Sequence, residues 1–246
     1  MSAEPFVTYL ELRESTPEGE QKGGLTHSLA GLVLLHVLEL AASGEPRGAV
    51  TVVHEAGEHG GRYLDQARQL AAQGWAVALP DLRGHGRSEG ARGHSNGMRE
   101  ILRDLGDVQD HLAYRQPEAP KVLLGHGLGA LWALAYACER PGEIAALALI
   151  EPRFQPRFEL PAKPAGMLKL FKKPNPEAEG RLGFGTASDP ADPLRHDRIT
   201  LRAAEEAQAA AAKYVPRLAE LALPVLRQER RDDAALLAWL EQALPR

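Results

Sequence analysis

The sequence has little cysteine, few aromatic residues and no strong excess of charge of either sign. The single cysteine among 246 residues, Cys138, excludes a disulfide bond within the chain and a zinc site built from several cysteines, and it makes a reducing compartment the default. There are 29 Lys and Arg against 33 Asp and Glu, so the net charge of −4 supplies no basic field that would recruit nucleic acid. Hydrophobic residues make up 44% and charged residues 25%, which indicates a globular chain, not a disordered or fibrous one.

Long hydrophobic runs are also absent. The longest apolar run, residues 31–40, is about half of the roughly 20 residues that a membrane helix needs, and it contains His36. Residues 1–20 carry several charged side chains and lack the apolar core of a signal peptide. We therefore expect no integral membrane segment and a cytoplasmic location.

Short β-rich runs alternate with longer helical patterns along the chain, which is typical of a parallel sheet with crossover helices. The patterns predict strands over residues 31–40, 48–54, 75–80, 121–125, 144–150 and 223–226. They predict helices over residues 63–73, 98–115, 129–139, 200–214 and 232–244. Residues 152–193 are rich in Pro, Lys and Gly and have weak periodicity. We expect one domain spanning residues 1–246, with residues 152–199 as a cap-like insertion.

The strongest local motif lies at residues 122–130, which read VLLGHGLGA. A strand, the pattern G-x-nucleophile-x-G and a helix follow one another as in a nucleophile elbow. The flanking Gly125 and Gly129 allow the strand and the helix to approach closely, and His126 precedes the central position. The central residue normally presents a hydroxyl group, but here it is Gly127, which has no side chain. The elbow therefore predicts a vacant nucleophile position.

Two further segments join the elbow in a family resemblance. Residues 52–63, VVHEAGEHGGRY, are similar to the loop after the third strand of α/β-hydrolases, and residues 80–90, PDLRGHGRSEG, are similar to the loop after the fourth. From residue 50 to about residue 149 the chain resembles the monoacylglycerol lipase or lysophospholipase-like branch of that family. A weaker resemblance covers residues 192–226. The resemblance implies an α/β-hydrolase fold, with a mostly parallel sheet, helices on both faces and an irregular cap.

Two departures from the family lie at the expected reaction centre. The family has a serine where this chain has Gly127, and a His-Gly pair where this chain has His54 and Glu55. The resemblance makes the backbone N–H groups of Ala56 and Leu128 the donors of the oxyanion hole. A carboxylate on Glu55 would oppose the negative charge that develops there.

A third departure concerns the end of the sheet. The family places an acid after the seventh strand and a histidine after the eighth. Here the predicted strand 223–226 is followed almost at once by residues 232–244, which resemble the terminal helix of the family. The segment that carries the acid, the eighth strand and the histidine has no counterpart, and 246 residues are few for the full fold. We therefore expect a sheet that is shortened at its C-terminal edge.

These departures predict a catalytically silent homologue of monoacylglycerol lipase that needs no cofactor or metal and keeps a pocket for a small apolar or acyl-like ligand. A serine hydrolase needs a nucleophile, a base and a group that orients the base, and none of the three is in its family position. One alternative is a carboxylic-ester hydrolase with a rebuilt site. It would use Glu151, which follows the sixth strand, and His196, with a nucleophile drawn from Ser88, Ser95 or Cys138.

Another alternative is a structural or interaction protein. The strand at residues 223–226 would then be an exposed sheet edge that pairs with a second copy in a homodimer, unless the helix at residues 232–244 covers it. A metal site at His54 and His59 is disfavoured because no third ligand has suggestive spacing. Residues 83–87 are expected to form a structural loop instead of a phosphate site. The basic and apolar stretch 167–173 is expected to be a solvated face of the cap instead of a lipid contact.

Overall fold

The computed structural model describes residues 3–13, 32–162, 175–184 and 191–245. The basic stretch 167–173 of the predicted cap lies outside the described residues. None of the described helices is both long enough and apolar enough to cross a membrane.

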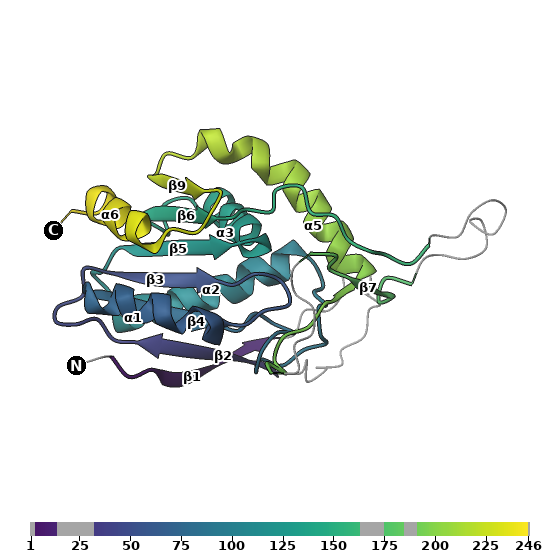
Figure 1. Ribbon diagram of the computed structural model, residues 1–246, viewed down its shortest axis with the longest axis horizontal. Coiled ribbons are helices and arrows are strands. Elements are labelled where there is room, and N and C mark those ends of the chain that lie inside the picture. Colours follow the sequence, from purple (N-terminus) through teal and green to yellow (C-terminus); the bar gives the residue numbers. More distant parts are fainter. Residues whose placement is uncertain (1–2, 14–31, 163–174, 185–190, 246) are drawn as a thin grey trace, which may run out of the picture.

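A seven-stranded sheet forms the centre of the molecule (Figure 1). Its spatial order is β1-β2-β4-β3-β5-β6-β9, and the strands from β4 to β9 run parallel while β1 and β2 are antiparallel to their neighbours. The strands are β1 Phe6–Arg13, β2 Leu32–Leu40, β3 Gly48–Val53, β4 Trp75–Pro80, β5 Lys121–His126, β6 Ala146–Ile150 and β9 Val225–Gln228. The residues of β3, β4 and β6 are all buried because helices cover both faces of these strands.

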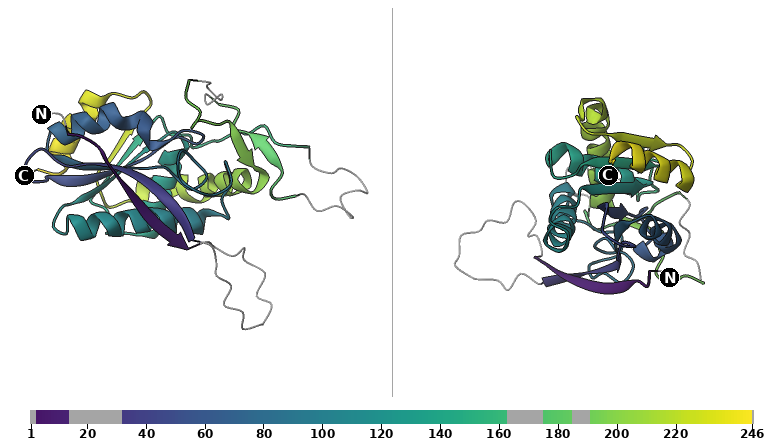
Figure 2. Two further views of the ribbon diagram at one scale, coloured as in Figure 1. Left: turned by 90° about the horizontal axis from the view of Figure 1, so that it is seen from below. Right: turned by 90° about the vertical axis from the view of Figure 1, so that its left-hand side faces the viewer.

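Helices lie on both faces of the sheet (Figure 2). Their bounds are η1 Gly60–Tyr63, α1 Leu64–Ala72, α2 Met98–Arg115, α3 Leu128–Glu139, α5 Leu201–Tyr214, η2 Val215–Glu220 and α6 Asp233–Ala243. Residues of α1 and α6 share one hydrophobic core, and residues of α2, α3 and α5 share the core on the other face. All but the last residue of α3 is buried, because the sheet, α2 and α5 surround this helix.

The predicted fold class is confirmed, and each predicted strand and helix is present with bounds that differ by a few residues. The sequence patterns missed β1. This strand is an edge of the sheet, and its side chains Val7 and Tyr9 are half-exposed, so the signal of a buried strand is weak. The predicted insertion at residues 152–199 contains a short antiparallel pair, β7 Glu179–Arg181 and β8 Arg198–Thr200, which the sequence also did not predict.

The other edge of the sheet is β9, and within the described residues no strand lies beyond it. The next helix, α6, packs against the face that also carries α1, with Leu236 and Leu240 fully buried there. Asp232 caps α6 by accepting the N–H of Ala235 at 2.9 Å. The helix thus covers a face of the sheet beside β9.

Candidate active site

The elbow joins β5 to α3 through Gly127. Its φ of +59° and ψ of −119° lie in a region that costs a residue with a side chain on the order of 1–3 kcal/mol. Its N–H group donates to the carbonyl of Ile150 at 3.0 Å, which ties the turn to β6. A Cβ atom at Gly129 would overlap the carbonyl oxygens of Val53 and His54, so the first turn of α3 lies directly on the end of β3. The chain therefore has the backbone of a nucleophile elbow with a glycine at its central position.

The carboxylate of Glu55 lies beside this elbow and is almost completely buried. Its Oε1 accepts the N–H of Leu128 at 2.8 Å and the N–H of Ala56 at 2.9 Å. These are the two N–H groups that the sequence assigned to the oxyanion hole. Glu55 therefore binds both donors itself.

The same carboxylate also fills the space beside Gly127. A Cβ atom built on Gly127 would lie 2.6 Å from Oε1 of Glu55 and closer still to Oε2 and Cδ. No real Cβ atom tolerates such a contact, so a side chain at position 127 and the present position of Glu55 exclude each other. The glycine at the nucleophile position and the glutamate in the adjacent loop form a matched pair.

Arg153 completes the surroundings of Glu55. Its Nε donates to Oε2 of Glu55 at 2.5 Å, and its backbone N–H donates to the carbonyl of Gly127 at 3.0 Å. Burial raises the pKa of Glu55 above its ordinary value, while the positive charge of Arg153 and the N–H of Leu128 act in the opposite direction. Sequence reasoning missed Arg153. The available signal was an arginine three residues after β6, at the end of the sheet where the elbow lies.

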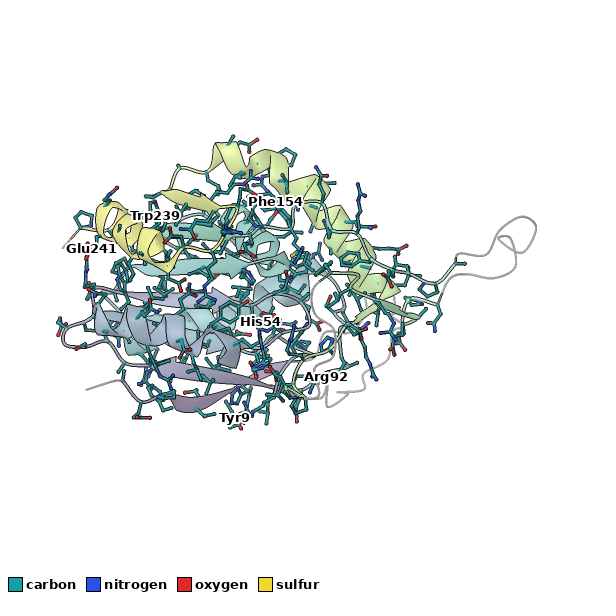
Figure 3. The ribbon with its side chains drawn as sticks, in the orientation of Figure 1. Tyr9, His54, Arg92, Phe154, Trp239 and Glu241 are labelled. Carbon is teal, nitrogen blue, oxygen red and sulfur yellow. The ribbon has the colours of Figure 1, made fainter. Side chains whose placement is uncertain are left out.

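His54 directly follows the last residue of β3 (Figure 3). Its Nε2 accepts the N–H of Leu82 at 2.9 Å, and its Nδ1 donates to the carbonyl of Glu55 at 2.8 Å. The ring of His85 lies 5.1 Å from that of His54 and 4.8 Å from that of His196. Three histidines thus form a row along one side of the site, which the sequence did not predict because they come from three separate loops.

The two residues of the rebuilt-site alternative do not meet. His196 donates from Nε2 to the carbonyl of Gly84 at 3.2 Å, and its Nδ1 accepts the N–H of Arg198 at 3.2 Å. Glu151 accepts the N–H of Arg231 at 3.0 Å and lies 3.4 Å from Nε2 of His126. Each of the two residues is therefore held by its own set of partners in this structure.

His126 belongs to a separate network on the α1 side. Its Nδ1 lies 2.7 Å from the hydroxyl of Tyr63, and its Nε2 lies near Glu151. Burial raises the pKa of Tyr63 well above its ordinary value, so this hydroxyl stays protonated. Both ring nitrogens of His126 therefore have partners within the protein.

A small cavity opens next to the two N–H donors. Its volume is about 60 Å³, and its lining includes Ala56, Leu128, Trp132, Ile199 and His85. An apolar cavity that holds benzene has about 150 Å³, so this space is too small for an acyl chain in the described arrangement. Among the described residues, no cluster of three or more His, Cys, Asp or Glu has the geometry of a metal site.

The sequence profile of the family described as serine aminopeptidase, S33, matches residues 44–234, which is most of the chain. The chain belongs to this family. The match covers β3, the elbow, residues 152–199 and the start of α6, so Gly127 lies inside the matched region.

Curated relatives of this S33-family chain include lipases. It is 38% identical over 108 residues to a monoacylglycerol lipase of Mycolicibacterium smegmatis, with 44% of this chain and 39% of the relative aligned. It is 39% identical over 110 residues to the human monoglyceride lipase, with 45% of this chain and 36% of the relative aligned. The chain therefore spans about two fifths of the length of these relatives.

Solved structures extend the likeness over most of the fold. The crystal structure of Paleococcus ferrophilus monoacylglycerol lipase has a TM-score of 0.60 at 26% identity, covering 86% of this chain and 84% of that one. A soluble variant of monoglyceride lipase from Saccharomyces cerevisiae, in complex with a substrate analog, has a TM-score of 0.62 at 18% identity, covering 87% and 80%. The second likeness shows the fold alone. Both show the α/β-hydrolase fold, and the first, like the curated relatives, is also similar in sequence to the monoacylglycerol lipase-like branch.

In this S33-family fold, Asp81 organises the loop after β4. Its carboxylate accepts the N–H of Gly60 at 2.7 Å and the N–H of Arg87 at 2.8 Å, and it lies 3.1 Å from Nδ1 of His36. Burial acts to raise its pKa, but His36 and the two N–H donors outweigh burial and lower the pKa to about 2. The carboxylate of Asp81 thus holds the loop that contains residues 83–87. This agrees with the prediction that these residues form a structural loop.

We expect Asp81→Asn to lower the free energy of unfolding at pH 6 by about 2 kcal/mol. The folded-state pKa lies below the ordinary value of 3.8, so this stabilisation is present above pH 3.8 and disappears as the pH falls through about 2. Urea unfolding at pH 6 and at pH 2.5 measures the difference. A loss of stability that is equally large at both pH values would contradict the assignment.

Proposed function

We propose that this chain is a catalytically silent α/β-hydrolase whose oxyanion site is filled by its own glutamate. The observation that supports the proposal is the position of Glu55, which binds the N–H groups of Ala56 and Leu128 and excludes a side chain at position 127. A tetrahedral intermediate of ester hydrolysis needs those donors for its oxyanion. Neither the donors nor space for a nucleophile is available here.

Within the described residues, no further strand after β9 carries the acid and the histidine that the family places at the elbow, and this adds support. Within the described residues, β9 leads into α6 without a further strand, and the imidazoles of His126 and His196 are held by other partners. The lipase names of the relatives describe those proteins. For this chain we propose the fold and the binding surface of the family without its hydrolytic step.

The size of the cavity beside Leu128 limits which ligand this chain can bind. Its space of about 60 Å³ suits a small apolar group and not an acyl chain. A homodimer through β9 has little physical support, because this edge strand has only four residues and carries Arg227, and short charged edges resist pairing.

The test measures turnover and active-site labelling together. We expect no fluorophosphonate labelling, and hydrolysis of p-nitrophenyl esters and of monoacylglycerols at the rate of a heat-denatured control. Glu55→Gly restores the His-Gly pair of the family and opens the donors, but it supplies no nucleophile, so this variant is expected to stay silent as well. Turnover in the unmodified chain that is lost in a Glu151 or His126 variant would refute the proposal.

A further inference from the structure

A second and much larger opening lies beside the filled site. It has a volume of about 590 Å³ and follows the carboxyl ends of the adjacent strands β6 and β9. We call it the arginine groove and define it by Arg153, Arg157, Arg227, Phe154 and Phe184. Figure 3 shows Phe154 beyond the end of β6. In open α/β sheets, ligands bind outside the carboxyl ends of the strands, and this volume suits a small molecule.

The charges of the arginine groove favour an anion. Its two glutamates are engaged, since Glu151 accepts the N–H of Arg231 and Glu229 pairs with Arg227 at 2.7 Å across an exposed contact. Among the described residues, no ion-pair partner is found for Arg157. Arg153 uses Nε for Glu55, and this leaves its two terminal amino groups for a ligand.

Aromatic rings hold two of the guanidinium groups in place. Cζ of Arg153 lies 4.2 Å from the ring centre of Phe184, and Cζ of Arg227 lies 5.4 Å from that of Phe154. A guanidinium group whose face rests on a ring keeps its N–H edges free, and these edges match the oxygens of an oxyanion. The same rings offer apolar surface to the organic part of a ligand.

We propose that the arginine groove binds a phosphate monoester. Its three arginines come from two segments, the loop after β6 and the strand β9, and they exceed what the two oxygens of one carboxylate can use, whereas a phosphate group has three terminal oxygens and a charge of about −1.5 to −2. The organic part of the ester lies against Phe154 and Phe184. This binding site is distinct from the filled oxyanion site and does not depend on whether hydrolysis occurs.

The test titrates the full chain with phenyl phosphate and with inorganic phosphate by isothermal calorimetry at low salt. We expect phenyl phosphate to bind about fivefold more tightly than inorganic phosphate because of the rings. Arg157→Gln and Arg227→Gln are each expected to weaken binding about tenfold. Arg68→Gln on α1, which removes the same charge from an exposed pair with Asp65, serves as the control and is expected to leave binding unchanged.

A second arm identifies the source of the phosphate group. Vesicles of phosphatidylcholine with and without phosphatidic acid are sedimented with the same variants. Binding only to vesicles that contain phosphatidic acid, lost in the Arg157 and Arg227 variants, supports the groove with a lipid headgroup as ligand. Binding of phenyl phosphate without vesicle binding supports it with a soluble ester. No binding in either arm, or an equal loss in Arg68→Gln, overturns the proposal.

Discussion

Replacing Gly127 by serine is expected to lower the free energy of unfolding by about 3–5 kcal/mol and to create no esterase. The new Cβ atom would overlap the carboxylate of Glu55. Glu55 must then leave the N–H groups of Ala56 and Leu128, and its contact with the partly exposed Arg153 breaks. The buried carboxylate of Glu55 then loses the groups that compensate its charge, and the positive φ at position 127 adds strain.

Gly142→Ser supplies a matched control for the backbone part of this effect. Gly142 has a φ of +85°, and a Cβ atom there would meet nothing within 4 Å. We expect this variant to cost about 1 kcal/mol from strain alone. Thermal unfolding of the two variants side by side separates the overlap with Glu55 from the cost of the positive φ.

The double variant Glu55→Gly and Gly127→Ser tests whether the two positions are coupled. Because glycine at position 55 removes the carboxylate, the serine then has space, and we expect about 2 kcal/mol of the loss to be recovered relative to the sum of the single variants. Equal stability losses in Gly127→Ser and Gly142→Ser would show that Glu55 does not occupy this space. If Gly127→Ser alone hydrolysed esters as fast as active members of the family, a general base would have to lie within hydrogen-bond distance of residue 127.

The fold could be predicted because its signals are local. The strands β3, β4 and β5 are short apolar runs, and α1 and α2 have clear helical spacing. The vacancy at Gly127 and the identity of the residue at position 55 could also be read from three motifs. The direction of the Glu55 side chain could not, because it depends on Arg153, which is 98 residues away in the sequence.

The row of three histidines also could not be predicted from the sequence. His54, His85 and His196 come from the loops after β3 and β4 and from the cap-like insertion, so no spacing rule relates them. Sequence reasoning considered His54 for a metal site and His196 for a rebuilt one. Instead, each ring accepts a backbone N–H, which favours the neutral imidazole. These contacts form only when the loops pack together, so the sequence pattern does not reveal them.

We expect the free energy of unfolding to fall by at least about 3 kcal/mol as the pH drops from 6.5 to 4. Burial lowers the pKa of His196 from 6.5 to about 4, and the difference between these values corresponds to about 3 kcal/mol. Burial also lowers the pKa of His54 and of His85, each below 6.5, and the charges of the neighbouring histidines act in the same direction on His85. In this pH window the unfolded chain binds protons that the folded chain does not, so stability rises with pH.

The hydrogen bonds of His54 and His196 also favour the neutral form of these buried rings. Nε2 of His54 and Nδ1 of His196 each accept a backbone N–H, from Leu82 and from Arg198. Protonation would place a second donor against each of these N–H groups and a positive charge among three neighbouring imidazole rings. The folded protein can accept the proton only by breaking those contacts.

His196→Gln tests the prediction because glutamine can keep both contacts and does not titrate. Its amide nitrogen can donate to the carbonyl of Gly84, and its amide oxygen can accept the N–H of Arg198. We expect this variant to lose about one proton from the pH dependence of unfolding between pH 6.5 and 4. His94→Gln, outside the row and within hydrogen-bond distance of Thr200, is the control for the effect of the substitution itself. An unchanged slope in His196→Gln would show that this ring is not the group that stays neutral on folding.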